Sequence, residues 1–133
     1  MPYVTSEMSA IMERVGQELG DESIVESLHF SSTALTMVRH VMMTHGTIIT
    51  DTTLAMADLD QEMVDKLGIQ VKCFIDDRQI MDMAAQRRTT RAEVALDYAL
   101  SLDGLKLIAV GSAPMALNRL LQRAALDPLS DVV

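Results

Sequence analysis

A short apolar run that leads through a tight turn into an amphipathic helix is the feature that most constrains this fold. The run covers residues 105–110 (LKLIAV), and its apolar, partly β-branched character predicts a buried strand. Gly111 ends the strand, Ser112 is a suitable N-cap, and Pro114 suits the first helical turn. The helix is expected to carry an apolar stripe formed by Met115, Leu117, Leu120 and Leu121.

Two interpretations of this turn remain open on residues alone. Its free backbone N–H groups and the positive end of the helix dipole favour an anion, and ligands of open α/β sheets bind at such turns. A single glycine is weak evidence for a ligand site, so the residues alone favour the second interpretation, an ordinary, well-capped connection. The Gly-rich fingerprint of a phosphate-binding loop is absent from the sequence.

Helical and strand patterns alternate along the chain, which predicts an α/β fold of the three-layer, doubly wound type. In this fold a largely parallel sheet carries helices on both faces. The predicted strands cover residues 26–30, 47–50, 69–75 and 105–110. The predicted helices start at Thr5 or Ser6, after residues 31–33, at Asp60, at Gln79, at Arg91 and after Ser112. A loop is expected after residue 50, and residues 1–133 are treated as one domain.

Composition excludes several classes of function. The net charge of −8 argues against nucleic acid and against an anionic membrane surface as partners. Cys73 is the only cysteine, so neither a disulfide framework nor a cysteine metal cluster is expected. The sequence shows no signal peptide and no apolar run of spanning length, and we expect a cytoplasmic protein. Hydrophobic residues make up 49% of this small chain, which favours a homo-oligomer that buries some of them.

Polar residues follow three of the predicted strands at the point where each strand ends. Asp51, the pair Asp76 and Asp77, and the turn at Gly111 should therefore lie along one edge of a parallel sheet, where ligands collect. A loop aspartate more often forms an Asx-turn or a helix cap, and that alternative stays open for Asp51, Asp76 and Asp77.

Four ordered segments resemble the precorrin-8X methylmutases, isomerases of cobalamin (corrin) biosynthesis. Residues 111–117 (GSAPMAL) resemble the Gly-Asn-Ala-Pro-Thr-Ala-Leu signature of that family. Residues 48–51 and 71–76 resemble two of its strands, and residues 89–92 resemble its Thr-Arg-Ala/Ser helix start. The resemblance covers about residues 14–128. It implies a methyl migration on a precorrin-8-type tetrapyrrole, without a metal or redox cofactor.

The resemblance also implies a set of substrate-binding residues. They are Arg14, Asp51, Thr90, Arg91, Gly111, Ser112, Ala113 and Pro114. Arg91 is the strongest candidate, because a guanidinium binds the carboxylates of a corrin precursor in a bidentate way. The alternative for Arg91 is a surface ion pair with Glu93 or Asp97. Arg119 and Arg123 are interpreted as surface charges.

The family's acid–base histidine lies in the pattern Arg-x-x-His-x-x-Gly, and residues 14–20 here read RVGQELG. Gln17 stands at the histidine position, and an amide hydrogen-bonds but delivers no proton. The alternative function is therefore a catalytically silent relative that binds a corrinoid or tetrapyrrole, or a piece of a split enzyme. Possible substitutes for the missing acid are His29, His45 and Glu18, each of which is more simply explained as structural or solvated.

Both ends of the chain are short relative to the family pattern. Residues 132–133 resemble the beginning of a further strand. We therefore expect an incomplete methylmutase-like domain, with an apolar sheet edge that associates with a second copy or a complementing subunit.

Overall fold

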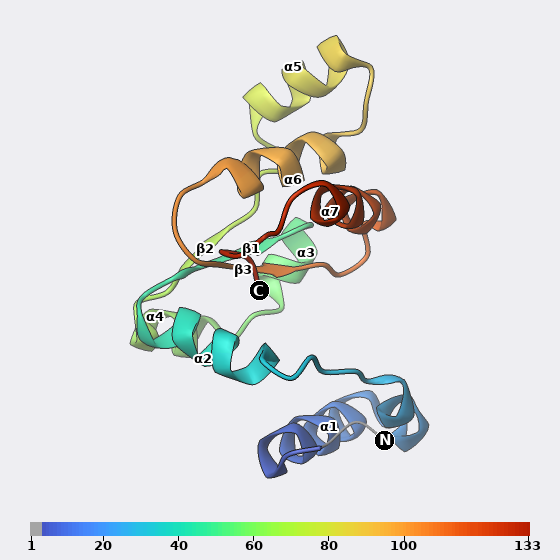
Figure 1. The fold of residues 1–133 in the computed structure, drawn as a ribbon, viewed down its shortest axis with the longest axis vertical. Helices are drawn as coiled ribbons and strands as arrows, with labels where there is room; N and C mark the ends of the chain where they lie inside the picture. Colours follow the sequence, from blue (N-terminus) through green and yellow to red (C-terminus); the bar gives the residue numbers. More distant parts are fainter. Residues whose placement is uncertain (1–3) are drawn as a thin grey trace. The chain divides into compact units, whose positions relative to one another are not determined.

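The structure is a computed structural model that describes residues 4–133. The chain forms two compact units, Met1–Met37 and Val38–Val133, and each is described by itself below (Figure 1). Within residues 4–133, no helix combines the length and the apolar character that crossing a membrane requires.

The first unit is built around helix α1 (Ser6–Leu19), as the sequence predicts. The Thr5 hydroxyl accepts the N–H of Met8 at 3.1 Å, and Gly20 ends the helix in the left-handed conformation with φ 64°. The 3₁₀ helix η1 (Glu22–Ser27) packs against α1. A Cβ atom on Gly16 would lie 3.1 Å from the Val25 side chain, so the two helices pack closely at this glycine.

The strand predicted over residues 26–30 is wrong. Residues 22–27 form η1, and no strand is assigned from residue 28 to residue 30. The physical reason is local, because the Asp21 carboxylate accepts both the N–H of Ser23 at 3.0 Å and its hydroxyl at 2.6 Å. Such a side-chain cap starts a helical turn, and this turn takes in Glu26 and Ser27 of the predicted strand.

The second unit is organised by a parallel sheet, which confirms the predicted α/β fold. Its strands are β1 (Thr47–Thr50), β2 (Gln70–Lys72) and β3 (Lys106–Ala109), in the order β2-β1-β3. Ile48 and Ile49 point to opposite faces of the central strand and are 3% and 4% exposed, so both faces are covered. β2 and β3 are shorter than the predicted runs.

Helices flank this sheet on both sides (Figure 1). They are α2 (Ala34–Met43), α3 (Thr53–Ala57), α4 (Gln61–Leu67), α5 (Arg78–Arg87), α6 (Arg91–Ser101) and α7 (Pro114–Leu126). Figure 1 shows α6 and α7 on one side of the sheet, and α4 with the C-terminal end of α2 on the other. α5 packs on the outside of α6 through Ile80, Ala84 and Val94. Helix α3 replaces the predicted loop, because the Thr52 hydroxyl caps it by accepting the N–H of Ala55 at 3.1 Å.

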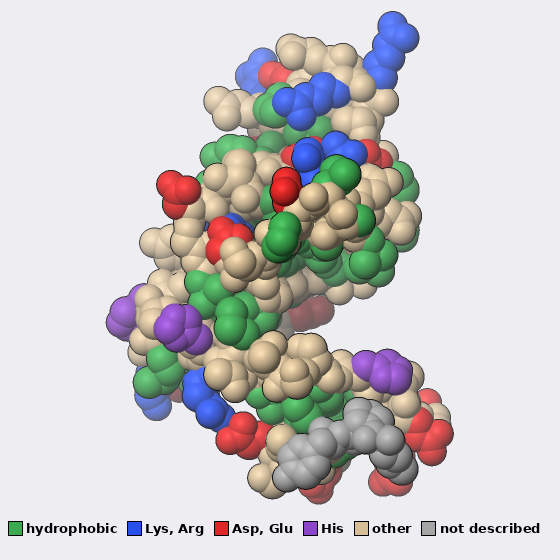
Figure 2. Space-filling view, in the orientation of Figure 1, with side chains coloured by type: hydrophobic (Ala, Val, Ile, Leu, Met, Phe, Trp, Pro, Cys, Tyr) green, Lys and Arg blue, Asp and Glu red, His purple; other side chains and the backbone are tan. Residues whose placement is uncertain are grey.

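Helix α7 differs from the prediction in its cap and in its buried face. Its N-cap is Ala113, without a side-chain hydrogen bond, and not Ser112. Ala116 is the buried residue at 3% exposure, whereas Leu117 and Leu121 of the predicted stripe are 45% and 60% exposed. Figure 2 shows hydrophobic side chains on the outer surface of this region.

The last residues lie along the free edge of β3. Lys106 forms a parallel bridge with Val132, and the N–H of Ile108 donates to the carbonyl of Val133 at 3.0 Å. This agrees with the expected strand character of residues 132–133. The Lys106 side chain, 2% exposed, donates to the Asp131 carboxylate at 2.8 Å, which fixes the same edge.

Candidate functional site at the carboxyl edge of the sheet

Asp51 connects the ends of the two longest strands. It follows β1, and its carboxylate accepts two backbone N–H groups from the turn after β3. The Gly111 N–H donates to Oδ1 and the Ala113 N–H to Oδ2, each at 2.9 Å. The N–H of Asp51 also donates to the carbonyl of Ala109 at 3.2 Å, which continues the pairing of β1 with β3. We call this arrangement of Asp51, Gly111 and Ala113 the aspartate clamp.

The clamp changes the interpretation of the strand–turn–helix segment. The two N–H groups that the sequence suggested for an anionic ligand are occupied by a carboxylate of the chain itself. The negative charge also lies at the N-terminal end of α7, where the helix dipole stabilises it. Neither an Asx-turn nor a helix cap describes Asp51, because Thr52 caps the following helix. Ser112 and Pro114 belong to the same turn, and both are exposed.

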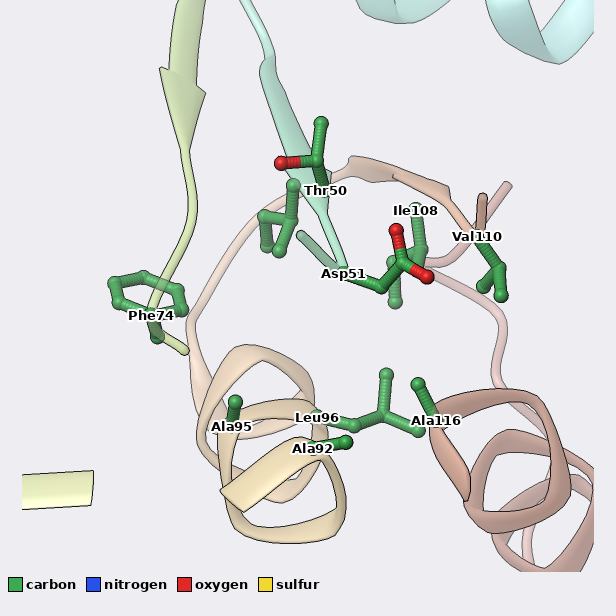
Figure 3. Close-up of a pocket in the computed structure, with 10 residues that line it drawn as sticks. Thr50, Asp51, Phe74, Ala92, Ala95, Leu96, Ile108, Val110 and Ala116 are labelled. Carbon is green, nitrogen blue, oxygen red and sulfur yellow. The ribbon is translucent and has the colours of Figure 1, made fainter. Parts of the chain in front are cut away.

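The start of α6 lies at the same edge of the sheet. Ala92 of α6 and Ala116 of α7 line one cavity together with Asp51 and Phe74, which follows β2 (Figure 3). The loops after all three strands therefore meet here, as the parallel layout predicts. The cavity holds only about 20 Å³ and is mostly apolar, so it is a packing gap about the size of one water molecule. A tetrapyrrole would have to bind outside it, on the open edge.

Thr90 and Arg91 begin α6. The Thr90 hydroxyl accepts the N–H of Glu93 at 3.2 Å, which confirms half of the expected capping box. The Glu93 carboxylate does not return to Thr90 and instead accepts the hydroxyl of Thr89 at 2.6 Å. Arg91 donates to the Asp76 carboxylate at 3.3 Å, and the two side chains are 49% and 64% exposed. The partner of Arg91 is thus neither of the two acids suggested by the sequence.

Arg119 and Arg123 are not simple surface charges. Arg119 binds both oxygens of Asp97, with Nε at 3.0 Å from Oδ1 and Nη2 at 2.8 Å from Oδ2, and Arg123 Nε donates to Oδ1 at 2.9 Å. Burial alone would raise the pKa of Asp97, but the hydrogen bonds and charges of the two guanidinium groups outweigh burial and lower it. This cluster joins α6 to α7, and so fixes the helix that begins at Arg91 relative to the helix that follows the clamp.

Arg14 and Gln17 belong to the first unit, on α1. Arg14 forms an ion pair with Glu18 at 2.9 Å, one helical turn away, with both side chains largely exposed. The Gln17 amide lies 3.4 Å from the Glu13 carboxylate, to which it donates. Gln17 and Glu13 line an open groove of about 660 Å³ together with Gly16, Gly20, Glu22 and Val25. Gln17 thus faces a groove that also contains two carboxylates.

The histidines considered as substitutes for the missing acid are all exposed. His45 has a structural contact, because its Nδ1 lies 2.9 Å from the carbonyl oxygen of Leu67. It also has a positive φ of 53°. Its ring therefore fixes the end of α4 against the start of β1.

Comparison with known proteins agrees with the resemblance in the motifs. The family model for precorrin-8X methylmutase (CbiC) matches residues 2–129. This chain belongs to the precorrin-8X methylmutase family. The cobalt-precorrin-8 methylmutase of Salmonella typhimurium is 32% identical over 114 residues, which are 85% of this chain and 54% of that protein. The enzyme of the same name from Priestia megaterium is 25% identical over 118 residues, 89% of this chain and 52% of that protein.

Solved structures of methylmutases show the same fold. A precorrin-8X methylmutase related protein superimposes with a TM-score of 0.84 at 22% identity, covering 99% of this chain and 69% of that chain. The precorrin-8X methylmutase of Thermus thermophilus gives a TM-score of 0.75 at 24% identity, and the match covers 87% of this chain and 56% of that chain. The chain spans about half the length of the curated methylmutases it matches.

Proposed function

We propose that this chain holds a precorrin-8-type tetrapyrrole with carboxylate side chains, and that it acts as an isomerase for methyl migration on that ring. The observation that supports this most is the carboxyl edge of the sheet. Four of the family-like segments, 48–51, 71–76, 89–92 and 111–117, are far apart in the sequence and each contributes a residue to the cavity at this edge. The name of the matching family and of its relatives supplies the substrate class.

Arg91 is the proposed carboxylate-binding group of this edge. Its guanidinium is 49% exposed, and its one hydrogen bond to Asp76 is 3.3 Å long. An exposed ion pair of this kind contributes only about 0–1 kcal/mol, so a substrate carboxylate can replace it at little cost. Thr90 and the turn residues 111–114 lie at the same edge and are proposed to contact the rest of the ligand.

Titration with cobyrinic acid, a corrin with carboxylate side chains, tests the binding. A charge-assisted hydrogen bond contributes about 1.5–3 kcal/mol, so Arg91→Ala should weaken binding roughly 10- to 100-fold at low salt. Arg87→Ala is the matched control, because it removes the same charge from the exposed end of α5. Equal affinities of the Arg91 and Arg87 variants would show that only net charge matters. If the unmodified chain does not bind cobyrinic acid either, the proposed function itself is contradicted.

The second candidate function is a catalytically silent, tetrapyrrole-binding relative or one piece of a split enzyme. Gln17 favours it, since its amide donates to Glu13 and carries no transferable proton at neutral pH. Migration of a methyl group between neighbouring ring carbons is easier when the macrocycle is protonated, and an imidazole suits that step because its pKa lies near neutrality.

Turnover measurements separate the two functions. General acid–base groups contribute roughly 100- to 10,000-fold in rate, so the unmodified chain should convert a precorrin-8-type substrate slowly or not at all. Gln17→His should raise the rate by up to that factor with little change in affinity. Gln17→Ala serves as the control, because it removes the amide without adding a base. The shift of ring absorption on methyl migration reports turnover. Rapid conversion by the unmodified chain would reject the silent alternative.

We also propose that the chain associates with a second copy or with a complementing subunit. The exposed leucines of α7, Leu117, Leu121 and Leu126, support this, with exposures of 45%, 60% and 76%. Light scattering should show a species larger than one chain at micromolar concentration. A stable monomer at all micromolar concentrations would contradict association with a second copy. A chain that also forms no complex when methylmutase partner chains are added would contradict association with a complementing subunit as well.

A further inference from the structure

The aspartate clamp leaves the turn after β3 with few ways to hold a ligand. Both oxygens of Asp51 are bound by N–H groups at 2.9 Å, which is the usual length of a charge-assisted hydrogen bond. A substrate carboxylate placed at the same two N–H groups would have to displace Asp51 and would then face its negative charge. The N–H groups of Gly111 and Ala113 are therefore already bound before any ligand arrives.

Ser112 lies between the two clamped residues. The N–H groups on either side of it, those of Gly111 and Ala113, are fixed to the end of β1, which restricts the backbone that carries the Ser112 side chain. Ser112 is exposed at the edge of the sheet, and its hydroxyl can donate one hydrogen bond. A group held in place in this way loses little entropy on binding.

We propose that Asp51 is a positioning residue and not a ligand-binding residue: its carboxylate holds the turn at residues 111–114 so that the Ser112 hydroxyl donates to a peripheral carboxylate of the tetrapyrrole. This inference rests on the proposed function for its ligand. It assigns different roles to two residues that the motif resemblance places in one substrate-binding set. Asp51 acts through the turn, and Ser112 is the group in contact.

The clamp is first measured without any ligand, by amide hydrogen exchange in the full chain. Asp51→Asn keeps one acceptor oxygen and nearly the same shape, so it tests the contact with little risk to folding. Exchange at Gly111 and Ala113 should become at least about tenfold faster. The N–H of Ile108, which donates to Val133 on the other edge of β3, should be unaffected and serves as the internal control. Unchanged rates at both turn amides would overturn the inference whatever the ligand does.

Binding of cobyrinic acid then tests the two roles with a double-mutant cycle. We expect Ser112→Ala and Asp51→Ala each to weaken binding by about fivefold or more, with Asp51→Asn in between. Adding Ser112→Ala to the Asp51→Ala chain should change affinity by less than about twofold, because the hydroxyl is no longer held in place. Independent, multiplying effects would overturn the inference, since Asp51 would then act elsewhere. Tighter binding by Asp51→Ala than by the unmodified chain would also overturn it, by showing that the N–H groups themselves bind the ligand. If the unmodified chain does not bind, the proposed function fails, and the exchange rates alone decide the positioning role.

Discussion

Replacing Asp97 by asparagine should loosen the connection between α6 and α7. The carboxylate is 12% exposed and accepts three hydrogen bonds from Arg119 and Arg123, between 2.8 and 3.0 Å long. A hydrogen bond to a charged group contributes about 1.5–3 kcal/mol when it is well shielded from water. Arg119 is 29% exposed and Arg123 44%, so both regain water when the bonds are lost. After this discount, and with one acceptor oxygen kept by asparagine, we expect a loss of roughly 2–3 kcal/mol.

Thermal unfolding followed by circular dichroism measures this loss. For a chain of this length, 1 kcal/mol corresponds to about 3–5 °C, so the melting temperature at pH 7 should fall by roughly 6–15 °C. Asp103→Asn is the matched control, because it removes the same charge from an exposed position after the same helix. A shift for Asp97→Asn that equals the control shift would refute the reasoning.

The pH dependence of the same variant gives an independent check. The two guanidinium groups lower the pKa of Asp97 in the folded chain below its value in the unfolded chain, about 3.9. The stabilisation is therefore complete above about pH 5 and is lost progressively as the pH falls further, because the unfolded chain takes up the proton first. The difference in melting temperature between the unmodified chain and Asp97→Asn should stay constant from pH 5 to 8 and shrink below pH 4. A difference that disappears between pH 5 and 8 instead would contradict the assignment to Asp97.

Two other sites give stability predictions that urea unfolding can check. Asp131→Ala leaves the buried Lys106 ammonium without its partner at 2.8 Å and should lower the free energy of unfolding by about 1–3 kcal/mol. Lys106→Met removes the charge, keeps most of the side-chain volume and should lower it by less. The reverse order would contradict a buried ion pair. Gly46→Ala places a Cβ 2.7 Å from a side-chain carbon of Val41 and 2.8 Å from its carbonyl oxygen and should cost about 1–3 kcal/mol; an unchanged midpoint would show that the turn before β1 adjusts freely.

The fold was largely predictable because local sequence patterns indicate its strands and the ends of its helices. The β-branched run of β1 and the apolar run of β3 mark strands, and Gly20 and Gly68 end their helices in the left-handed conformation, as their positions predict. Local patterns also explain the failures. Asp21 starts a 3₁₀ turn through a side-chain hydrogen bond, and Thr52 starts α3 in the same way. The free energy of such a bond is similar in size to the propensities on which the predicted strand and loop depend.

The candidate site was predictable in its residues but not in their contacts. The motif resemblance identifies Asp51 and the turn at Gly111, yet the bond between them joins positions 60 residues apart, which no local pattern contains. Arg119 and Arg123 share one helix face through their spacing of four, but their acceptor, Asp97, lies on the preceding helix. Sequence patterns show which side chains lie on one face, while partners across elements follow only from the packing of the helices.

The division of the chain at Met37 assigns Gln17, which the motif resemblance aligns with the family's histidine, to one unit, and the edge that we propose holds the ligand to the other. Gln17 lies in a helix whose caps, Thr5 and Gly20, and whose close packing at Gly16 come from the first unit alone. The clamp and the start of α6 draw only on the second unit. The side chain at position 17 takes part in none of the hydrogen bonds described for the clamp and for the start of α6. Under the proposed function, a single substitution at position 17 changes turnover while recognition at the edge persists, so the same chain offers a route from a tetrapyrrole sensor to an enzyme, and the reverse.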